Sequence, residues 1–132
     1  MGRFHGRSVL QIVFNEISAS EISQLGTLEQ LELLSEFKVT ADDVEKIAAG
    51  EHPKFGCIER DGKMLFRYRA KDSRIYFEVC GESVIVHRVL HRNTFTDFLF
   101  RTNLGDVDED EELAKNKHFW TLIAEGKNAR RV

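Results

Sequence analysis

The sequence has little of what builds a disulfide scaffold, a metal site or a membrane span. It contains two cysteines, one proline and one tryptophan. Neither Cys57 nor Cys80 has a second cysteine or a histidine at zinc-ligand spacing, and no secretory signal precedes them. The apolar runs are all far shorter than a membrane-spanning helix requires. We therefore expect a reduced, cytoplasmic protein without a metal or a cofactor, in which both cysteines pack as small apolar side chains.

Composition and length are those of one globular domain. The chain has 132 residues, of which 42% are hydrophobic and 31% charged, so it is too apolar for a disordered chain and long enough to bury a sizeable core. We expect three segments: a flexible basic leader over residues 1–7, a main domain over residues 8–101, and an acidic turn with an amphipathic helix over residues 102–132.

Charge is unevenly distributed along the chain, although the net charge is only −3. Residues 54–101 carry ten Lys/Arg against six acids, a net charge of +4. Residues 8–53 carry two Lys against nine acids (−7), and residues 102–132 carry five Lys/Arg against seven acids (−2). A basic middle between acidic flanks predicts a local anionic partner rather than a wholly basic surface.

The N-terminal half is predicted to form a strand followed by helices. Residues 9–14 are rich in β-branched side chains and apolar on both faces, which is typical of a strand in the centre of a sheet. Ser18 or Ser20 can cap a first helix and Thr27 a second, and apolar residues then recur at helical spacing at Leu25, Leu28, Leu31, Leu34 and Phe37. We expect this helical hairpin to cover one face of the sheet, followed by a helix from Ala41 to about Ala49 that Thr40 caps.

From residue 55 the apolar period changes to two, which predicts an antiparallel meander. Its strands are expected over Phe55–Arg60, Met64–Ala70, Arg74–Cys80 and Ser83–Leu90, joined by turns at Asp61-Gly62, Lys71-Asp72-Ser73 and Gly81-Glu82. Asn93 or Thr94 then caps a helix to about Arg101, and a last helix is expected over about residues 109–125. The fold class is therefore α+β: an N-terminal strand and helical hairpin packed on a twisted antiparallel sheet, with C-terminal helices.

Arginines gather on one face of this meander. Alternation places Arg67 and Arg69 on one face, with Phe66 and Tyr68 on the other. A short turn brings Arg74 near them, and like charges on adjacent strands repel unless acids or a bound anion neutralise them. The guanidinium group of an arginine can donate two parallel, charge-assisted hydrogen bonds to the oxygens of a phosphate. Two interpretations stay open: a solvated face neutralised by Glu59, Asp72 and Glu78, or a phosphate site.

Histidine and arginine stand together where the last strand gives way to a helix. His91 and Arg92 occupy this junction, a common place for functional side chains, whereas His87 lies mid-strand and is better explained as structural. A histidine can transfer protons near neutral pH, and a neighbouring arginine can hold a phosphate. No two histidines have metal-ligand spacing, so we expect no metal.

Four segments carry a resemblance to a known family. The strand over residues 9–14, Leu-Glu-Gln-Leu at 28–31, "LFRYRAKDSRIYFEV" and "VIVHRVLHRNTFTDFLF" together resemble the RelE/ParE superfamily of bacterial toxin–antitoxin toxins over roughly residues 8–101. The specific part is the order R-x-R, a short turn, R-I-Y-F-E and a valine-rich strand that ends in H-R. The resemblance implies the toxin of a type II toxin–antitoxin system with a cognate antitoxin protein as partner.

The RelE-like branch implies a metal-independent endoribonuclease that cleaves messenger RNA on the ribosome and so inhibits translation. The RNA supplies its own 2′-hydroxyl nucleophile, and arginines stabilise the charge that develops on the scissile phosphate. The resemblance assigns catalysis to Arg74, His91 and Arg92, with His91 as the general acid or base. It assigns RNA binding to Arg67, Arg69, Lys71 and Phe98.

Two departures from the family pattern keep other functions open. Many RelE-like toxins have a tyrosine where this chain has Phe98, whose ring can stack on a base but cannot exchange a proton. Toxins of the family are usually basic, whereas this chain is net acidic. The alternatives are a ParE-like inhibitor of DNA gyrase, which would share the fold, and a catalytically silent interaction module. The helix beyond residue 101 can cover the site, contact a partner or complete the core.

Overall fold

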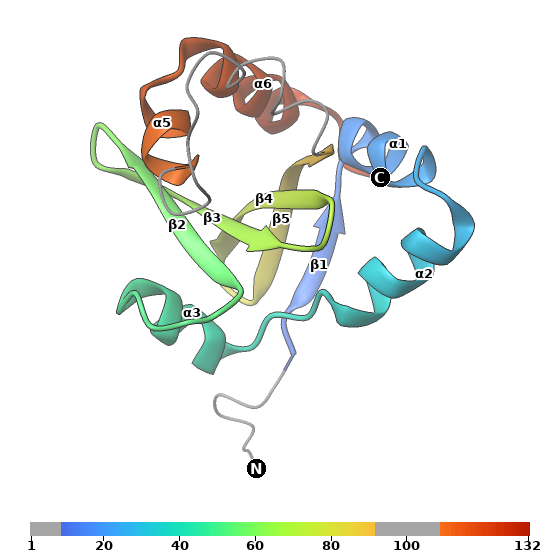
Figure 1. Ribbon diagram of the computed structural model, residues 1–132, viewed down its shortest axis with the longest axis horizontal. Coiled ribbons are helices and arrows are strands. Elements are labelled where there is room, and N and C mark those ends of the chain that lie inside the picture. The colour runs from blue at the N-terminus through green and yellow to red at the C-terminus, as the bar shows by residue number, and fades with distance from the viewer. Residues whose placement is uncertain (1–8, 92–108) are drawn as a thin grey trace.

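A five-stranded sheet forms the centre of the protein (Figure 1). The computed structural model describes residues 9–91 and 109–132. The strands are β1 (Gln11–Phe14), β2 (Phe55–Arg60), β3 (Lys63–Arg69), β4 (Ser73–Cys80) and β5 (Ser83–His91). Their order in the sheet is β1-β5-β4-β3-β2, in which β1 pairs with β5 in parallel and the other neighbours are antiparallel. The predicted meander is confirmed, with Asp61 and Gly62 both at positive φ in the first turn.

Helices lie on both faces of the sheet, so the α+β class is confirmed. They are α1 (Glu16–Ser23), α2 (Thr27–Glu36), α3 (Ala41–Ala48), α5 (Glu109–Lys115) and α6 (Lys117–Asn128). None of the helices in the described ranges is long and apolar enough to cross a membrane. The predicted leader over residues 1–7, the helix that Asn93 or Thr94 was expected to cap, and the turn up to residue 108 lie outside the described residues.

The first strand lies at the edge of the sheet, so its predicted central position is wrong. β5 pairs with one side of β1, and the C-terminal end of the chain covers the end of its other side. There the Val132 amide donates to the Phe14 carbonyl at 3.0 Å, and the Glu16 amide donates to the Arg130 carbonyl at 2.8 Å. Apolar side chains on both faces of β1 are therefore explained by helices and tail packed around an edge strand, which the apolar pattern alone cannot distinguish from a central one.

Two helices begin at residues that satisfy their first amides. Asn15, rather than Ser18 or Ser20, caps α1: its Oδ1 accepts from the Ser18 amide at 2.7 Å, and the Ser18 hydroxyl accepts from the Asn15 amide in return. Thr40 caps α3 as expected, through the same reciprocal arrangement with Asp43. Both Asn15 and Ser18 are residue types that favour the N-cap position. Ser18 is buried, and its hydroxyl donates to the Val86 carbonyl of β5, so Asn15 takes the cap position.

The leucines of the helical hairpin do not all face the sheet. Leu33 of α2 is buried at 5% exposure, but Leu28, Leu31 and Leu34 are exposed by 70%, 62% and 45%. The prediction is therefore wrong for Leu28, Leu31 and Leu34, whereas Leu25 and Phe37 of the same repeat do pack in the core. Each step of three residues turns a helix by about 300°, so the repeat winds slowly around the helix, and Leu33 and Phe37 anchor the other side.

Two apolar layers flank the sheet. One lies between the sheet and α1, α2 and α3 and contains Phe37, Phe66, Tyr68 and Phe77. The other lies beneath α5 and α6 and contains Leu65, Tyr76, Leu113, Phe119 and Ile123. Alternation along β3 and β4 therefore sends side chains to the faces that the sequence predicts.

The predicted last helix is two helices. Asn116 separates α5 from α6, and its side chain accepts from the Phe119 amide at 2.9 Å as the cap of α6. The first turn of α5 is acidic, with Glu109, Asp110, Glu111 and Glu112. Cys57 is half-buried and packs against the apolar layer under α1, α2 and α3, as expected, whereas Cys80 is exposed, so the prediction is wrong for Cys80.

Candidate anion-binding face

The sheet brings the three predicted arginines to one face. Arg69 of β3 lies directly opposite Arg74 of β4, and Arg67 lies opposite Tyr76. Because alternate residues share a face, Arg67, Arg69, Arg74 and Tyr76 all lie on the side that α5 and α6 cover. We call Arg67, Arg69 and Arg74 the arginine face. Two arginines directly opposite each other repel, so this pair needs negative charge nearby.

Arg67 is bound by a carboxylate of α5. Its Nε donates to Asp110 Oδ1 at 3.0 Å, and its Nη2 donates to Asp110 Oδ2 at 2.8 Å. Nη1 donates to the Lys54 carbonyl at 3.3 Å. Arg67 is only 7% exposed, and its guanidinium lies where Gly56 of β2 has no side chain; a Cβ there would overlap Nη2. The two-oxygen contact is the fork geometry that arginine offers to oxyanions.

Arg74 is bound by the neighbouring acid. Its Nε donates to Glu109 Oε2 at 3.1 Å, and both side chains of this ion pair are about nine-tenths buried. Its Nη1 donates to the carbonyls of Ala70 and Ser73, each at 3.1 Å, which holds the guanidinium over the β3–β4 turn. The first turn of α5 therefore places two successive carboxylates on two arginines of the face.

Burial and the nearby carboxylates of α5 shift the pKa values of two side chains on this face. Burial opposes the charge of Arg67, but the hydrogen bonds and charge of Asp110 outweigh it, so the pKa of Arg67 lies above its usual value. Burial, with Glu109 and Asp110 nearby, raises the pKa of the Tyr76 phenol well above its usual value. Arg67 therefore remains cationic and Tyr76 neutral at physiological pH.

The acids that pair with Arg67 and Arg74 are not the ones expected. Glu59, Asp72 and Glu78 were the candidate partners on neighbouring strands, whereas the carboxylates on Arg67 and Arg74 come from Glu109 and Asp110. The Glu78 carboxylate instead contacts Lys127 at 3.1 Å and His87 at 3.5 Å. The run of acids from Asp106 to Glu112 was a visible signal, but sequence spacing does not show which strand a distant helix will cover.

His91 lies on the opposite side of the sheet from Arg74. It pairs with Ser73, and successive residues Ser73 and Arg74 point to opposite faces. Ser73 and His91 line an open hollow of about 370 Å³ beside α1 and α2, together with Glu21, Gln24 and Glu29. Two carboxylates make this hollow unfavourable for a phosphate. The structure therefore brings the three arginines together but places the His91 side chain elsewhere.

The remaining predicted site residues are divided between the surface and the undescribed segment. Lys71 is exposed in the β3–β4 turn, close in sequence to Arg69 and Arg74. Arg92 and Phe98 lie outside the described residues. Within the described ranges, no group of three or more histidine, cysteine, aspartate or glutamate side chains is arranged to hold a metal ion.

Arg88 of β5 has a structural role that its position in the sequence does not indicate. Its Nη2 donates to Glu21 Oε2 at 2.7 Å, and its Nη1 donates to the Leu122 carbonyl at 3.0 Å. It therefore connects β5 to α1 and α6 across the molecule.

Comparison of the chain with protein-family models, with curated proteins and with solved structures finds no match.

Proposed function

We propose that this protein is a RelE-like toxin that cleaves messenger RNA on the ribosome and is held in check by an antitoxin protein. The observation that carries the proposal is the arginine face. The residues that the resemblance assigns to phosphate contact, Arg67, Arg69 and Arg74, lie on one face, with Arg69 and Arg74 directly opposite each other. An extended RNA backbone presents successive phosphates, and neighbouring guanidinium groups on one sheet face are suited to contact them.

The carboxylates of α5 bear directly on this function. Asp110 and Glu109 contact the forks of Arg67 and Arg74 through the kind of charge-assisted hydrogen bonds that a phosphate oxygen makes. RNA therefore has to replace these carboxylates, and α5 has to move away from β2 and β4 when RNA binds. The arginines then stabilise the phosphate as charge develops during attack by the 2′-hydroxyl.

Proton transfer is the least supported step. His91 was the candidate acid or base, and its side chain lies across the sheet from Arg74. Arg74 is accordingly the residue on which the proposed catalysis depends most, and a role for His91 requires the RNA to pass around the end of β5.

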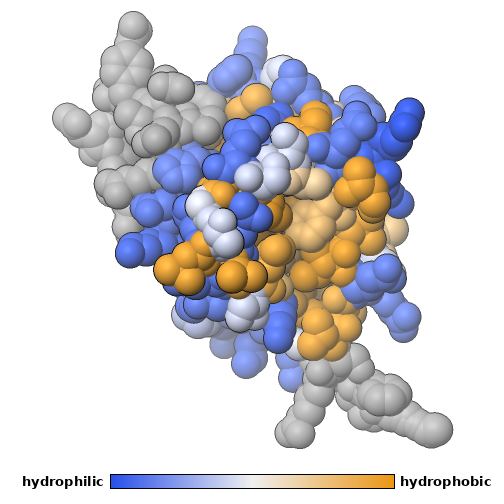
Figure 2. Space-filling view, turned by 90° about the vertical axis from the view of Figure 1, so that its right-hand side faces the viewer, coloured by the Kyte–Doolittle hydropathy of each residue, from blue (hydrophilic) through white to orange (hydrophobic). Residues whose placement is uncertain are grey.

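The proposed antitoxin has a suitable surface on α2. Leu28, Leu31 and Leu34 are exposed, and apolar side chains gather on this side of the molecule (Figure 2). Residues 9–37 contain five acids and no lysine or arginine. A second copy of the same face would set acid against acid, so the occupant we propose is an apolar segment of the antitoxin that also carries lysine or arginine.

A second candidate function is a catalytically silent interaction module. It is favoured by the same two ion pairs, because carboxylates already neutralise Arg67 and Arg74. In that case α5 is a permanent part of the core, and the arginine face binds no RNA.

Controlled expression in a bacterial host separates these functions. We expect the wild-type chain to arrest growth and to produce messenger RNA ends at codons in the ribosomal A site, mapped by primer extension. Arg74→Ala should abolish both effects, whereas Arg60→Ala, at the far end of the β2–β3 hairpin, should leave them unchanged. Arrest with DNA damage but intact messenger RNA would indicate a gyrase inhibitor instead. Harmless expression of both the wild type and Asp110→Asn would support the silent module.

A further inference from the structure

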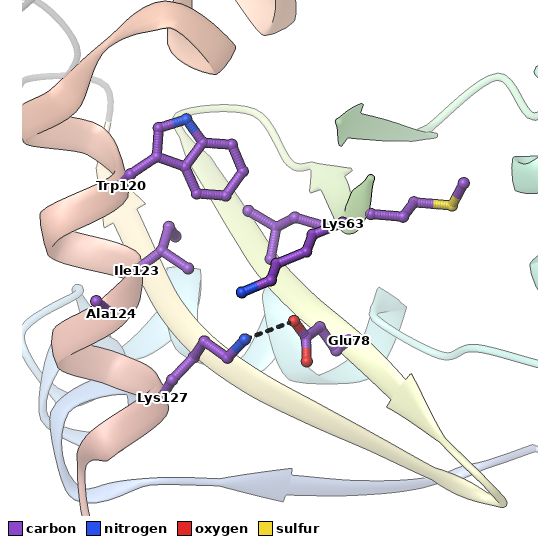
Figure 3. A pocket seen from close by; sticks show the side chains of 8 residues that line it. Lys63, Glu78, Trp120, Ile123, Ala124 and Lys127 are labelled. Atoms are coloured by element: carbon purple, nitrogen blue, oxygen red, sulfur yellow. Dashed lines mark hydrogen bonds and ion pairs between the residues drawn. The ribbon is translucent and has the colours of Figure 1, made fainter. Parts of the chain in front are cut away.

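A pocket between α6 and the β3–β4 sheet lies apart from the arginine contacts with α5 (Figure 3). Its volume is about 160 Å³. A cavity of about this size accommodates a single benzene ring. Its lining includes three strand residues and three helix residues: Lys63, Leu65, Glu78, Trp120, Ile123 and Lys127.

One half of the pocket is apolar and already held in place. Leu65 and Ile123 are each 2% exposed, so their side chains form a fixed floor. The Trp120 indole Nε1 donates to the Ala114 carbonyl at 2.8 Å, and the Arg60 guanidinium lies 5.6 Å from the ring centre. Both contacts fix the orientation of the ring, so a flat apolar group could enter without reorganising the wall.

The other half carries an excess of positive charge. Lys63, Glu78 and Lys127 all line this half, and the Lys127 ammonium points toward Glu78 (Figure 3). Lys127 Nζ contacts Glu78 Oε1 at 3.1 Å, while no ion pair or hydrogen bond joins the Lys63 ammonium to another described residue. The lining therefore holds two ammonium groups and one carboxylate, an excess of one positive charge beside the apolar half.

We propose that this pocket binds a small aromatic carboxylate. The ring lies against Leu65 and Ile123 beside Trp120, and the carboxylate accepts hydrogen bonds from Lys63 and Lys127. The volume limits the ligand to about one ring. The charge excludes an amine, and the apolar floor disfavours a bare inorganic anion, because its remaining hydration would be lost without compensation. The proposal does not depend on RNA binding at the arginine face.

The single tryptophan makes the test direct, because the indole N–H of Trp120 gives one resolved signal in a nitrogen–proton NMR spectrum. The full chain is titrated with benzoate, with benzylamine as the same ring of opposite charge, and with acetate as the same charge without a ring. We expect saturable benzoate-dependent shifts of the Trp120 indole and of the Leu65 and Ile123 amides, and at least tenfold weaker effects from the other two compounds.

Variants separate pocket binding from general charge effects. Lys63→Met should weaken benzoate binding about fivefold or more, because it removes the unpaired ammonium. Lys71→Met, an exposed lysine on the β3–β4 turn, should not change it. Ala124→Phe should fill the pocket and abolish the shifts, with the melting temperature reporting that the fold is kept. Absence of saturable shifts, equal binding of benzylamine, or unchanged affinity in Lys63→Met would overturn the proposal.

Discussion

The guanidinium of Arg67 occupies space that a glycine leaves open. A Cβ on Gly56 would overlap Nη2 of Arg67, so a side chain there must push the fork away from Asp110. We predict that Gly56→Ala lowers the free energy of unfolding by about 2 kcal/mol, because a largely buried charge loses part of its pairing.

Urea denaturation measures this loss. Gly26→Ala is the control, since no atom lies within 4 Å of a Cβ at Gly26. Its expected cost is below about 1 kcal/mol, because Gly26 is the N-cap of α2 and glycine is preferred over alanine there. Equal stability of the Gly56→Ala and Gly26→Ala proteins would show that Arg67 is not confined as described.

His87 should make stability depend on pH. Burial lowers the pKa of the His87 imidazole below its usual 6.5, and the nearby Glu78 only partly offsets this. As pH falls through about 6.5, the unfolded chain takes up this proton before the folded one does, so the free energy of unfolding decreases toward the lower, folded pKa. Above about 6.5 this contribution is fully present.

The check is denaturation at several pH values between 8 and 5. The wild type should lose more stability over this range than His87→Gln, whereas replacing exposed His118 by glutamine should preserve the wild-type slope. Parallel pH profiles for the wild type and His87→Gln would contradict the buried, neutral state of His87.

At the scale of elements, α6 packs against β5 more closely than any residue but glycine permits. A Cβ on Gly126 would overlap the backbone carbonyl of His87. The Asn15 amide fixes the same contact, because it donates to the carbonyls of Gly126 at 2.8 Å and of Val86 and His87 at 3.1 Å. We predict that Gly126→Ala destabilises the protein by about 2–3 kcal/mol.

Thermal unfolding is the measurement for Gly126→Ala. Thr121→Ala, an exposed substitution on the same helix, is expected to leave the melting temperature close to that of the wild type. If both variants melt alike, the close approach of α6 and β5 is wrong.

The leucines of α2 give a matched pair of substitutions within one helix. Leu33 is buried and Leu31 is 62% exposed. Leu33→Ala should cost about 2–4 kcal/mol of folding free energy, whereas Leu31→Ser should cost less than about 0.5 kcal/mol. Chemical denaturation distinguishes the two, and similar losses would mean that the exposed face of α2 is packed. The antitoxin surface proposed here predicts that Leu31→Ser, although stable, weakens partner binding.

At the scale of the whole molecule, local signals in the sequence were sufficient to predict the antiparallel meander of β2 to β5 but not the whole sheet. Period-two apolarity and the turn at Asp61-Gly62 located the meander, and the same alternation placed Arg67 and Arg69 on one face. The position of β1 could not be predicted, because apolar side chains on both faces fit an edge strand under helices as well as a central one.

The acids that pair with Arg67 and Arg74 also could not be predicted from local sequence patterns. Glu109 and Asp110 are 35 and 43 residues away from Arg74 and Arg67 in sequence, and only the packing of α5 and α6 on the sheet brings them together. The face on which His91 lies could not be predicted either, for a different reason. An irregularity in pairing between Tyr76 and Phe77 shifts the register of β5, so alternation counted from its start does not give the faces at its end.

The central claim is that the arginine face binds RNA phosphates in competition with the carboxylates of α5. The most direct measurement is the affinity of a short single-stranded RNA at several salt concentrations for the wild type, Arg69→Ala and Asp110→Asn, with circular dichroism confirming each fold. We expect Arg69→Ala to weaken binding and to make it less salt-dependent, because a phosphate contact is lost, and Asp110→Asn to strengthen binding. RNA affinity that is undetectable in all three proteins, or unchanged by both substitutions, would contradict it.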